Sequence, residues 1–143
     1  MAEFLSGATL VLKDGSKVSA QNHLKDKVVG LYFSAGWCPA CRPFTPKLKE
    51  KKPFEVVFVS RDKEKEDLDE YFDEHQGNWC YIEFGDPLIE QLYQKYDVVG
   101  MPTLRIIKSD GSVAVEDARK ELVDRGADEP LALFNDWQKA SSN

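Results

Sequence analysis

The chain has 143 residues and a formal net charge of −6; 42% of its residues are hydrophobic and 31% are charged. This length predicts a single domain over residues 1–143 that buries roughly two-thirds of its unfolded surface. The acidic balance argues against nucleic acid and against membrane surfaces as partners, since both carry negative charge. No apolar run is long enough to span a membrane, and the first six residues lack the basic and apolar regions of a secretory signal.

Apolar runs separated by turn residues predict strands and helices in alternation, which favours a three-layer α/β domain. The expected strands, in chain order, are 9–13, 17–20, 28–34, 54–60, 103–108 and 112–115. Asp14-Gly15 and Asp110-Gly111 suit hairpin turns within the first and last pairs, so we expect an N-terminal hairpin over about 8–20. The expected helices run from 39 to about 51, from a cap at Asp62, from Asp86-Pro87 and from near 128 or 129.

Each of the last three expected helices carries apolar residues at helical spacing, which predicts one buried face per helix. The expected inward positions are Leu68, Tyr71, Phe72 and His75, then Leu88, Ile89, Leu92, Tyr93 and Tyr96, and finally Leu131, Phe134 and Trp137.

Cys38 and Cys41 form a Cys-x-x-Cys motif where the apolar strand 28–34 meets the next helix. Pro39 suits the first helical position, because the N–H that it lacks would have no partner there. Unpaired N–H groups and the macrodipole at a helix N-terminus favour a thiolate, which is the nucleophile in disulfide exchange. Cys41 lies one turn deeper, within bridging reach. The motif therefore predicts a reversible dithiol/disulfide couple within a redox core over about 28–140.

The sequence gives less support to two other roles for the motif, a zinc site and a structural disulfide. A structural zinc usually needs four ligands, and the chain adds only Cys80, His23 and His75, at no paired ligand spacing, so no metal is expected. A structural disulfide over so short a loop would constrain the unfolded chain little. Three cysteines do not make a disulfide framework, so we expect a reducing cytoplasmic compartment, with nuclear residence left open.

Three stretches of the chain carry a family signature. Residues 32–46 read YFSAGWCPACRPFTP, residues 54–62 read FEVVFVSRD, and Gly100-Met101-Pro102-Thr103 precedes a strand. These stretches, with Asp117-Ala118-Arg119 and a following leucine, resemble the tryparedoxin and nucleoredoxin branch of the thioredoxin superfamily. The resemblance covers most of the chain from about residue 28 onward. It implies a thioredoxin-like three-layer α/β/α sandwich around a central mixed sheet.

The resemblance also implies roles for individual residues. Met101-Pro102 should be a cis peptide bond that faces the cysteines, and Trp37 should join that turn in an apolar lip for the substrate. Trp79 would line the substrate side of the site. Tyr32 stands where typical thioredoxins carry a buried aspartate; a phenol ionises near pH 10, so we expect Tyr32 to support the site and not to act as an anionic base.

Four features stay open or depart from the branch. Arg42 either adds positive potential near the sulfurs or lies along the helix surface. Cys80 is expected to be a small buried hydrophobe, with a third redox thiol or an intermolecular bridge as the alternatives. Pro39-Ala40 replaces the usual pair of prolines, and the segment from Cys41 to Phe54 is about two turns shorter than the family's helix.

The predicted function is protein-disulfide reduction. Cys38, exposed at the helix tip, attacks a target disulfide, and the shielded Cys41 then releases the reduced target. One alternative is a redox-sensitive interaction module that binds a specific signalling partner with little general turnover. Another is an oxidase or isomerase of the secretory pathway, which the absence of a signal and of a histidine between the cysteines disfavours.

The expected partners follow from this chemistry. They are disulfide-containing protein substrates and an upstream thiol reductant, which is thioredoxin reductase, glutathione or, by analogy with tryparedoxins, trypanothione. We expect a monomer that needs no cofactor.

Overall fold

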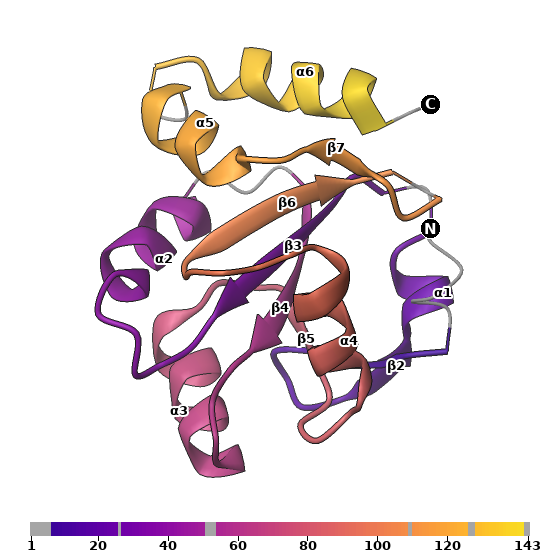
Figure 1. Cartoon of the computed structure of the whole chain (residues 1–143), viewed down its shortest axis with the longest axis vertical. Helices are drawn as coiled ribbons and strands as arrows, with labels where there is room; N and C mark the ends of the chain where they lie inside the picture. Colours follow the sequence, from indigo (N-terminus) through magenta and orange to yellow (C-terminus); the bar gives the residue numbers. More distant parts are fainter. Residues whose placement is uncertain (1–6, 26, 51–53, 109, 126–127, 142–143) are drawn as a thin grey trace.

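The computed structural model describes residues 7–25, 27–50, 54–108, 110–125 and 128–141. Among these residues, seven strands form one mixed sheet in the order β2-β1-β5-β4-β3-β6-β7 (Figure 1). The strands are β1 (Thr9–Val11), β2 (Lys17–Ser19), β3 (Val29–Ser34), β4 (Glu55–Ser60), β5 (Cys80–Ile82), β6 (Thr103–Ile107) and β7 (Val113–Val115). The helices are α1 (Ala20–His23), α2 (Cys41–Glu50), α3 (Lys65–His75), α4 (Leu88–Lys95), α5 (Ala118–Arg125) and α6 (Pro130–Ser141).

β3 lies inside the sheet and leads directly to the Cys-x-x-Cys motif. It pairs in parallel with β4 on one side and antiparallel with β6 on the other, and all six of its residues are buried. Its near-continuous apolar sequence reflects this position, because helices cover both faces of the sheet. The two predicted hairpins are confirmed, with Gly15 and Gly111 at positive φ in their turns.

The alternation of side chains along the strands divides the core between the two faces of the sheet. On one face, Tyr32 and Phe58 pack with buried residues of α2, α3, α5 and α6. On the other face, Leu31 and Val57 pack with buried residues of α1 and α4. The helices therefore form two layers around the sheet, which confirms the predicted sandwich. No helix in the described part of the chain is long and apolar enough to cross a membrane.

Several details differ from the sequence-based expectations. β5, α1 and α5 were not expected, because β5 has only three residues, α1 has only four, and α5 buries only Ala118 and Leu122. In α6 the expected inward residue Leu131 is 75% exposed, and Leu133 is buried in its place. The contacts of α6 with β6, β7 and α5 select this face of the helix. His75, expected on the inner face of α3, is exposed.

Other limits shift by one or two residues, as element ends commonly do. The first six residues and Lys51, on which sequence predictions also rest, lie outside the described residues.

Candidate active site

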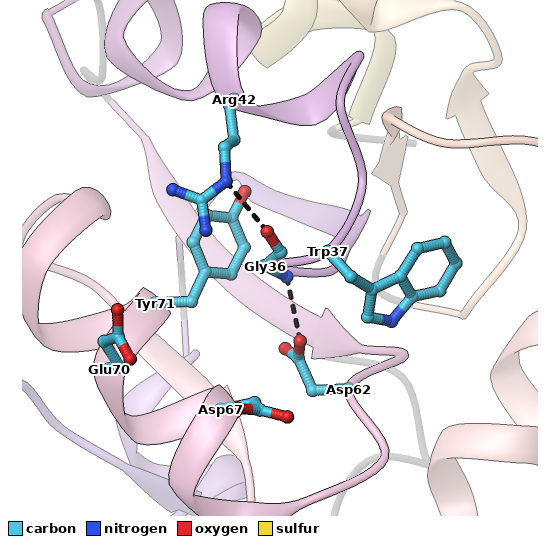
Figure 2. Close-up of a pocket in the computed structure, with 7 residues that line it drawn as sticks. All are labelled: Gly36, Trp37, Arg42, Asp62, Asp67, Glu70 and Tyr71. Carbon is cyan, nitrogen blue, oxygen red and sulfur yellow. Dashed lines mark hydrogen bonds between the residues drawn. The ribbon is translucent and has the colours of Figure 1, made fainter.

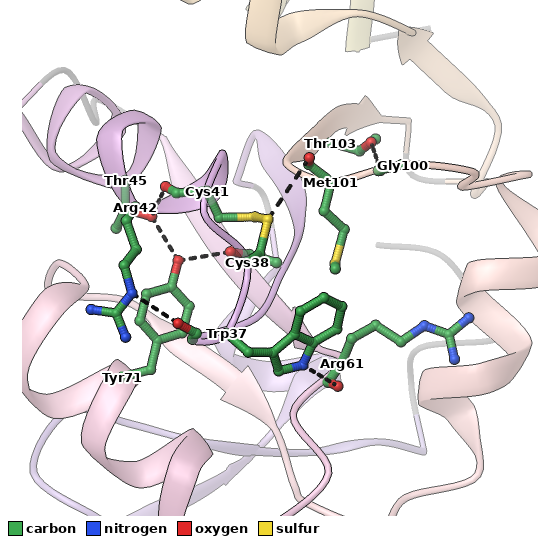
Figure 3. The surroundings of a disulfide bond; sticks show 12 residues. Trp37, Cys38, Cys41, Arg42, Thr45, Arg61, Tyr71, Gly100, Met101 and Thr103 are labelled. Carbon is green, nitrogen blue, oxygen red and sulfur yellow. Dashed lines mark hydrogen bonds between the residues drawn. A yellow bond between two sulfur atoms is a disulfide. The ribbon is translucent and has the colours of Figure 1, made fainter.

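Cys38 and Cys41 are joined by a disulfide in the turn that follows β3 (Figure 3). The N–H of Cys38 donates to the carbonyl of Ala35, and the N–H of Cys41 donates to the carbonyl of Cys38. α2 begins at Cys41, so the expected helix start at Pro39 is corrected: Pro39 lies in the turn. Cys41 is thus the first helical residue and not one turn inside the helix. The end of β3 and the beginning of α2 together hold the two sulfurs.

The disulfide is mostly covered. Cys38 is 5% exposed and Cys41 is fully buried, and both pack with Ala35 in a small cluster that Met101 covers in part. The prediction of an exposed Cys38 is therefore wrong for this disulfide form, although Cys38 remains the more accessible of the two. The Met101-Pro102 peptide bond is cis, as predicted. The carbonyl oxygen of Met101 lies 3.9 Å from Cys38 Sγ, which brings the second half of the chain onto the motif (Figure 3).

An exposed tryptophan lies beside the disulfide. Trp37 is 57% exposed, and its indole Nε1 donates to the carbonyl of Arg61 at 3.1 Å (Figure 3). The Arg61 guanidinium lies 3.9 Å from the ring centroid of Tyr93 and binds Glu90 at 2.8 Å, which fixes the segment that holds the indole. Val99, near Met101, is also exposed. The disulfide is therefore bordered by apolar surface that is open to a partner.

The backbone of Gly36 is held by hydrogen bonds through both its N–H and its carbonyl group (Figure 2). Its N–H donates to Asp62 Oδ1 at 2.8 Å, and its carbonyl accepts from Arg42 Nε at 2.8 Å. A Cβ at Gly36 would lie 3.1 Å from the Cβ of Tyr71, so a larger residue would press on α3. Asp62 was expected to cap α3, but Glu64 occupies the N-cap position. These contacts explain Arg42 better than either sequence-based reading, since its guanidinium supports the turn.

Next to this turn the surface forms a cleft of about 220 Å³. Asp62, Asp67 and Glu70 supply acidic groups to its lining, together with Arg42 and Trp37 (Figure 2). The cleft is polar on the α3 side and apolar on the Trp37 side.

The Asp62 carboxyl, which accepts from the Gly36 N–H, has a pKa shifted by its surroundings. Burial raises the pKa of its carboxyl above the ordinary 3.8, while hydrogen bonds from the Ser60 hydroxyl and the Gly36 N–H oppose that shift. Because the unfolded chain then releases this proton at lower pH than the folded protein, ionisation of Asp62 reduces stability as the pH rises above about 4. We expect Asp62→Asn, which keeps an acceptor for Gly36, to gain stability relative to the natural chain between pH 4 and 7. Urea unfolding of both proteins across this range measures the gain; a stability difference that does not change with pH would contradict it.

Four hydroxyl groups form a buried chain beneath Cys41. The Thr45 hydroxyl donates to the Cys41 carbonyl at 3.0 Å and lies 2.6 Å from Tyr32 Oη and 2.8 Å from Tyr71 Oη. The Ser34 hydroxyl lies 2.7 Å from Tyr71 Oη. The protons of these four hydroxyl groups can all be donated in one direction along the network, toward the Cys41 carbonyl. Burial raises the pKa of Tyr32 far above its usual value, so Tyr32 is a neutral phenol that supports the site and cannot act as an anionic base.

Trp79, expected on the substrate side, and Cys80, expected to be a small buried hydrophobe, are both covered. Trp79 is 2% exposed and packs edge-on to Tyr32 with centroids 6.5 Å apart, while its Nε1 donates to Gln76 Oε1 at 2.8 Å. A side chain so covered does not line a substrate surface, so that expectation is corrected. Cys80 is buried outside any disulfide, at the start of β5, and packs on the α1 and α4 face of the sheet. It does not belong to the cluster that holds Cys38 and Cys41.

The sequence did not identify three residues that support the turn through tertiary hydrogen bonds, namely Ser34, Asp62 and Tyr71. Asp62 follows a buried strand, as a site residue often does, but it resembles a helix cap equally well. Tyr71 has the helical spacing of a core residue, and nothing in that spacing reveals its hydroxyl contacts.

Comparison with known proteins gives consistent matches. The model of a family described as thioredoxin-like matches residues 26–113. A probable nucleoredoxin 1 of Arabidopsis thaliana is 40% identical over 124 residues, which cover 81% of this chain and 21% of that protein. The chain thus spans about a fifth of the length of this plant relative.

Solved structures match over nearly their whole length. A thioredoxin from Wuchereria bancrofti has a TM-score of 0.81 at 41% identity, covering 92% of this chain and 96% of that one. A tryparedoxin II complexed with glutathionylspermidine has a TM-score of 0.77 at 31% identity, covering 90% and 93%.

Proposed function

The chain belongs to the thioredoxin-like family, and from this premise we propose that it is a thiol–disulfide oxidoreductase that reduces disulfide bonds of proteins. The observation that carries the proposal is the disulfide between Cys38 and Cys41, held beneath exposed apolar surface at the end of a central strand. Cys38 is the more accessible sulfur and Cys41 the fully buried one, which supports a nucleophile and a resolving thiol in that order.

The proposed reaction transfers two electrons from the reduced pair to a target. The Cys38 thiolate attacks one sulfur of the target disulfide, that bond breaks, and the other target sulfur leaves as a thiolate. Cys41, as its thiolate, then attacks Cys38 Sγ, which forms the internal disulfide and releases the second target thiolate; solvent protonates both. Buried hydroxyl groups beneath Cys41 support the turn throughout, through Thr45 and the Cys41 carbonyl.

A thiol reductant must return the disulfide to the dithiol after each turnover. We propose a thiol of low molecular weight or a thioredoxin reductase as this donor, in the cytoplasm. The relative solved with glutathionylspermidine supports the first class, because that ligand is a thiol of low molecular weight. Glutathione and trypanothione are the compounds to compare first, with the steady-state rate of target reduction as the readout.

A second candidate is a redox-sensitive interaction module that binds one protein partner. The exposed side chain of Trp37 beside the disulfide favours it, since exposed apolar side chains at a site are typical of binding surfaces. Both functions require a working couple, but only the reductase turns over on unrelated disulfides.

Reduction of insulin disulfides with dithiothreitol as the electron donor tests the proposed function. We expect the natural chain to turn over well above a Cys38→Ser blank, because the thiolate that starts the exchange is then absent. Precipitation of the insulin B chain gives the rate. If the folded protein does no better than the blank, general reductase activity is wrong and the partner-specific module replaces it.

A further inference from the structure

Three potential metal ligands, His23, Glu55 and Cys80, lie together away from the disulfide, on the face of the sheet that α1 covers. Cys80 begins β5 and is paired with Val57 of β4. Register partners of parallel strands point to the same face, and residues two apart in one strand do so too. Glu55, two residues before Val57, therefore projects from the same face as Cys80. His23, the last residue of α1, completes the cluster from the helix above.

The three side chains converge at short distances. Cys80 Sγ, one nitrogen of His23 and one carboxylate oxygen of Glu55 all lie within 4.8 Å of one another. His23 Nε2 lies 3.4 Å from Glu55 Oε1, yet it is buried and has no hydrogen-bond partner among the described residues. A buried nitrogen in this condition is costly unless something satisfies it. The second oxygen, Glu55 Oε2, faces Lys27 Nζ at 3.7 Å, which leaves Oε1 to the cluster.

We propose that Cys80, His23 and Glu55 bind a Zn²⁺ ion, with a water as the fourth ligand. Thiolate sulfur, imidazole nitrogen and carboxylate oxygen are the ligands that zinc takes in proteins, and three of them leave one position open. A cleft of about 460 Å³, lined by His23, Glu55, Asp14 and Asn78, gives solvent access to this position. Binding releases the Cys80 thiol proton to solvent, so affinity rises with pH. The sequence spacing alone predicted no metal, because the ligands come from three separate elements.

The chain contains its own comparison. Glu70, Glu74 and His75 also bring their ligand atoms within 4.8 Å, but all three are exposed and none offers a sulfur. Exposed carboxylates are well hydrated, so the cluster of Glu70, Glu74 and His75 gains less by binding a metal. The two histidines thus provide matched variants, His23→Ala at the proposed site and His75→Ala at the control cluster.

Cobalt titration of the 143-residue chain carrying Cys38→Ser and Cys41→Ser tests the site with Cys80 as its only thiol. We expect one Co²⁺ per chain, a thiolate-to-cobalt absorption band in the near ultraviolet, and loss of that band when Zn²⁺ is added. Adding Cys80→Ala should abolish the band, and adding His23→Ala should weaken binding by roughly tenfold or more. Adding His75→Ala should change neither.

Thermal unfolding with and without Zn²⁺ gives a second readout that does not depend on the spectrum. Zn²⁺ should raise the Tm of the double serine variant and of its His75→Ala form but not of its His23→Ala form, since a ligand stabilises only the state that binds it. A band that survives Cys80→Ala, affinity that His23→Ala leaves unchanged, or the absence of any band with excess cobalt would each overturn the proposal. None of these outcomes bears on the reductase activity, because both active-site cysteines are serine throughout.

Discussion

Replacing Cys41 with serine is expected to convert the protein into a trap for its targets, whereas replacing Cys38 should abolish reaction with them. In Cys41→Ser the more accessible thiol remains and attacks, but the resolving thiol is gone, so the mixed disulfide persists. In Cys38→Ser the Cys41 sulfur remains, but it is fully buried, so turnover should fall by a factor on the order of 10³ or more. Non-reducing electrophoresis after incubation with insulin that has intact disulfides detects the trapped adduct directly.

Cys80→Ser is the matched control, because it removes the third thiol of the chain, which lies outside the cluster that holds the disulfide. It should turn over like the natural chain and trap nothing. If Cys38→Ser trapped the adduct and Cys41→Ser did not, the two roles would be exchanged while the oxidoreductase function stood. If neither variant formed an adduct, the exchange mechanism itself would be wrong.

Trp137→Ala is expected to destabilise the fold by about 3–5 kcal/mol, the usual cost of deleting a large buried ring. Trp137 is 1% exposed, packs edge-on to Phe54 with centroids 5.1 Å apart, and donates from Nε1 to Glu121 at 3.0 Å. Truncation leaves a cavity between α6 and the sheet and breaks the link to α5. Thermal unfolding should show a fall in Tm of roughly 10–20 °C.

Leu131→Ala provides the control on the same helix. Leu131 is exposed, so its removal should change the free energy of unfolding by less than about 0.5 kcal/mol. The family model matches only as far as residue 113, and α6 lies beyond it. A loss of stability in Trp137→Ala no larger than that in Leu131→Ala would mean that α6 is not an integral part of the folded unit.

Local patterns predicted six of the seven strands in the described residues and both hairpin turns, but missed the three-residue strand β5. The runs at 28–34 and 54–60 are nearly all apolar, and such runs fit strands that are covered on both faces. Asp-Gly pairs placed both hairpins, because glycine takes positive φ without strain. The helix faces were less predictable: α5 buries too few side chains to show a stripe, and α6 offers Leu131 and Leu133 as competing inward positions.

Local sequence patterns were enough to identify the residues of the dithiol pair. Two cysteines three apart, after an apolar strand and before a helix, specify a dithiol pair through local geometry, and the Met101-Pro102 turn was identified by its resemblance to the same family. The residues that surround this pair could be identified only from the packing of separate elements. Asp62, Tyr71 and the cluster of His23, Glu55 and Cys80 acquire their contacts only when separate elements pack together. The physical reason is that spacing along a chain specifies hydrogen bonds and faces within one element, whereas contacts between elements depend on the sheet register and on the helices that cover it.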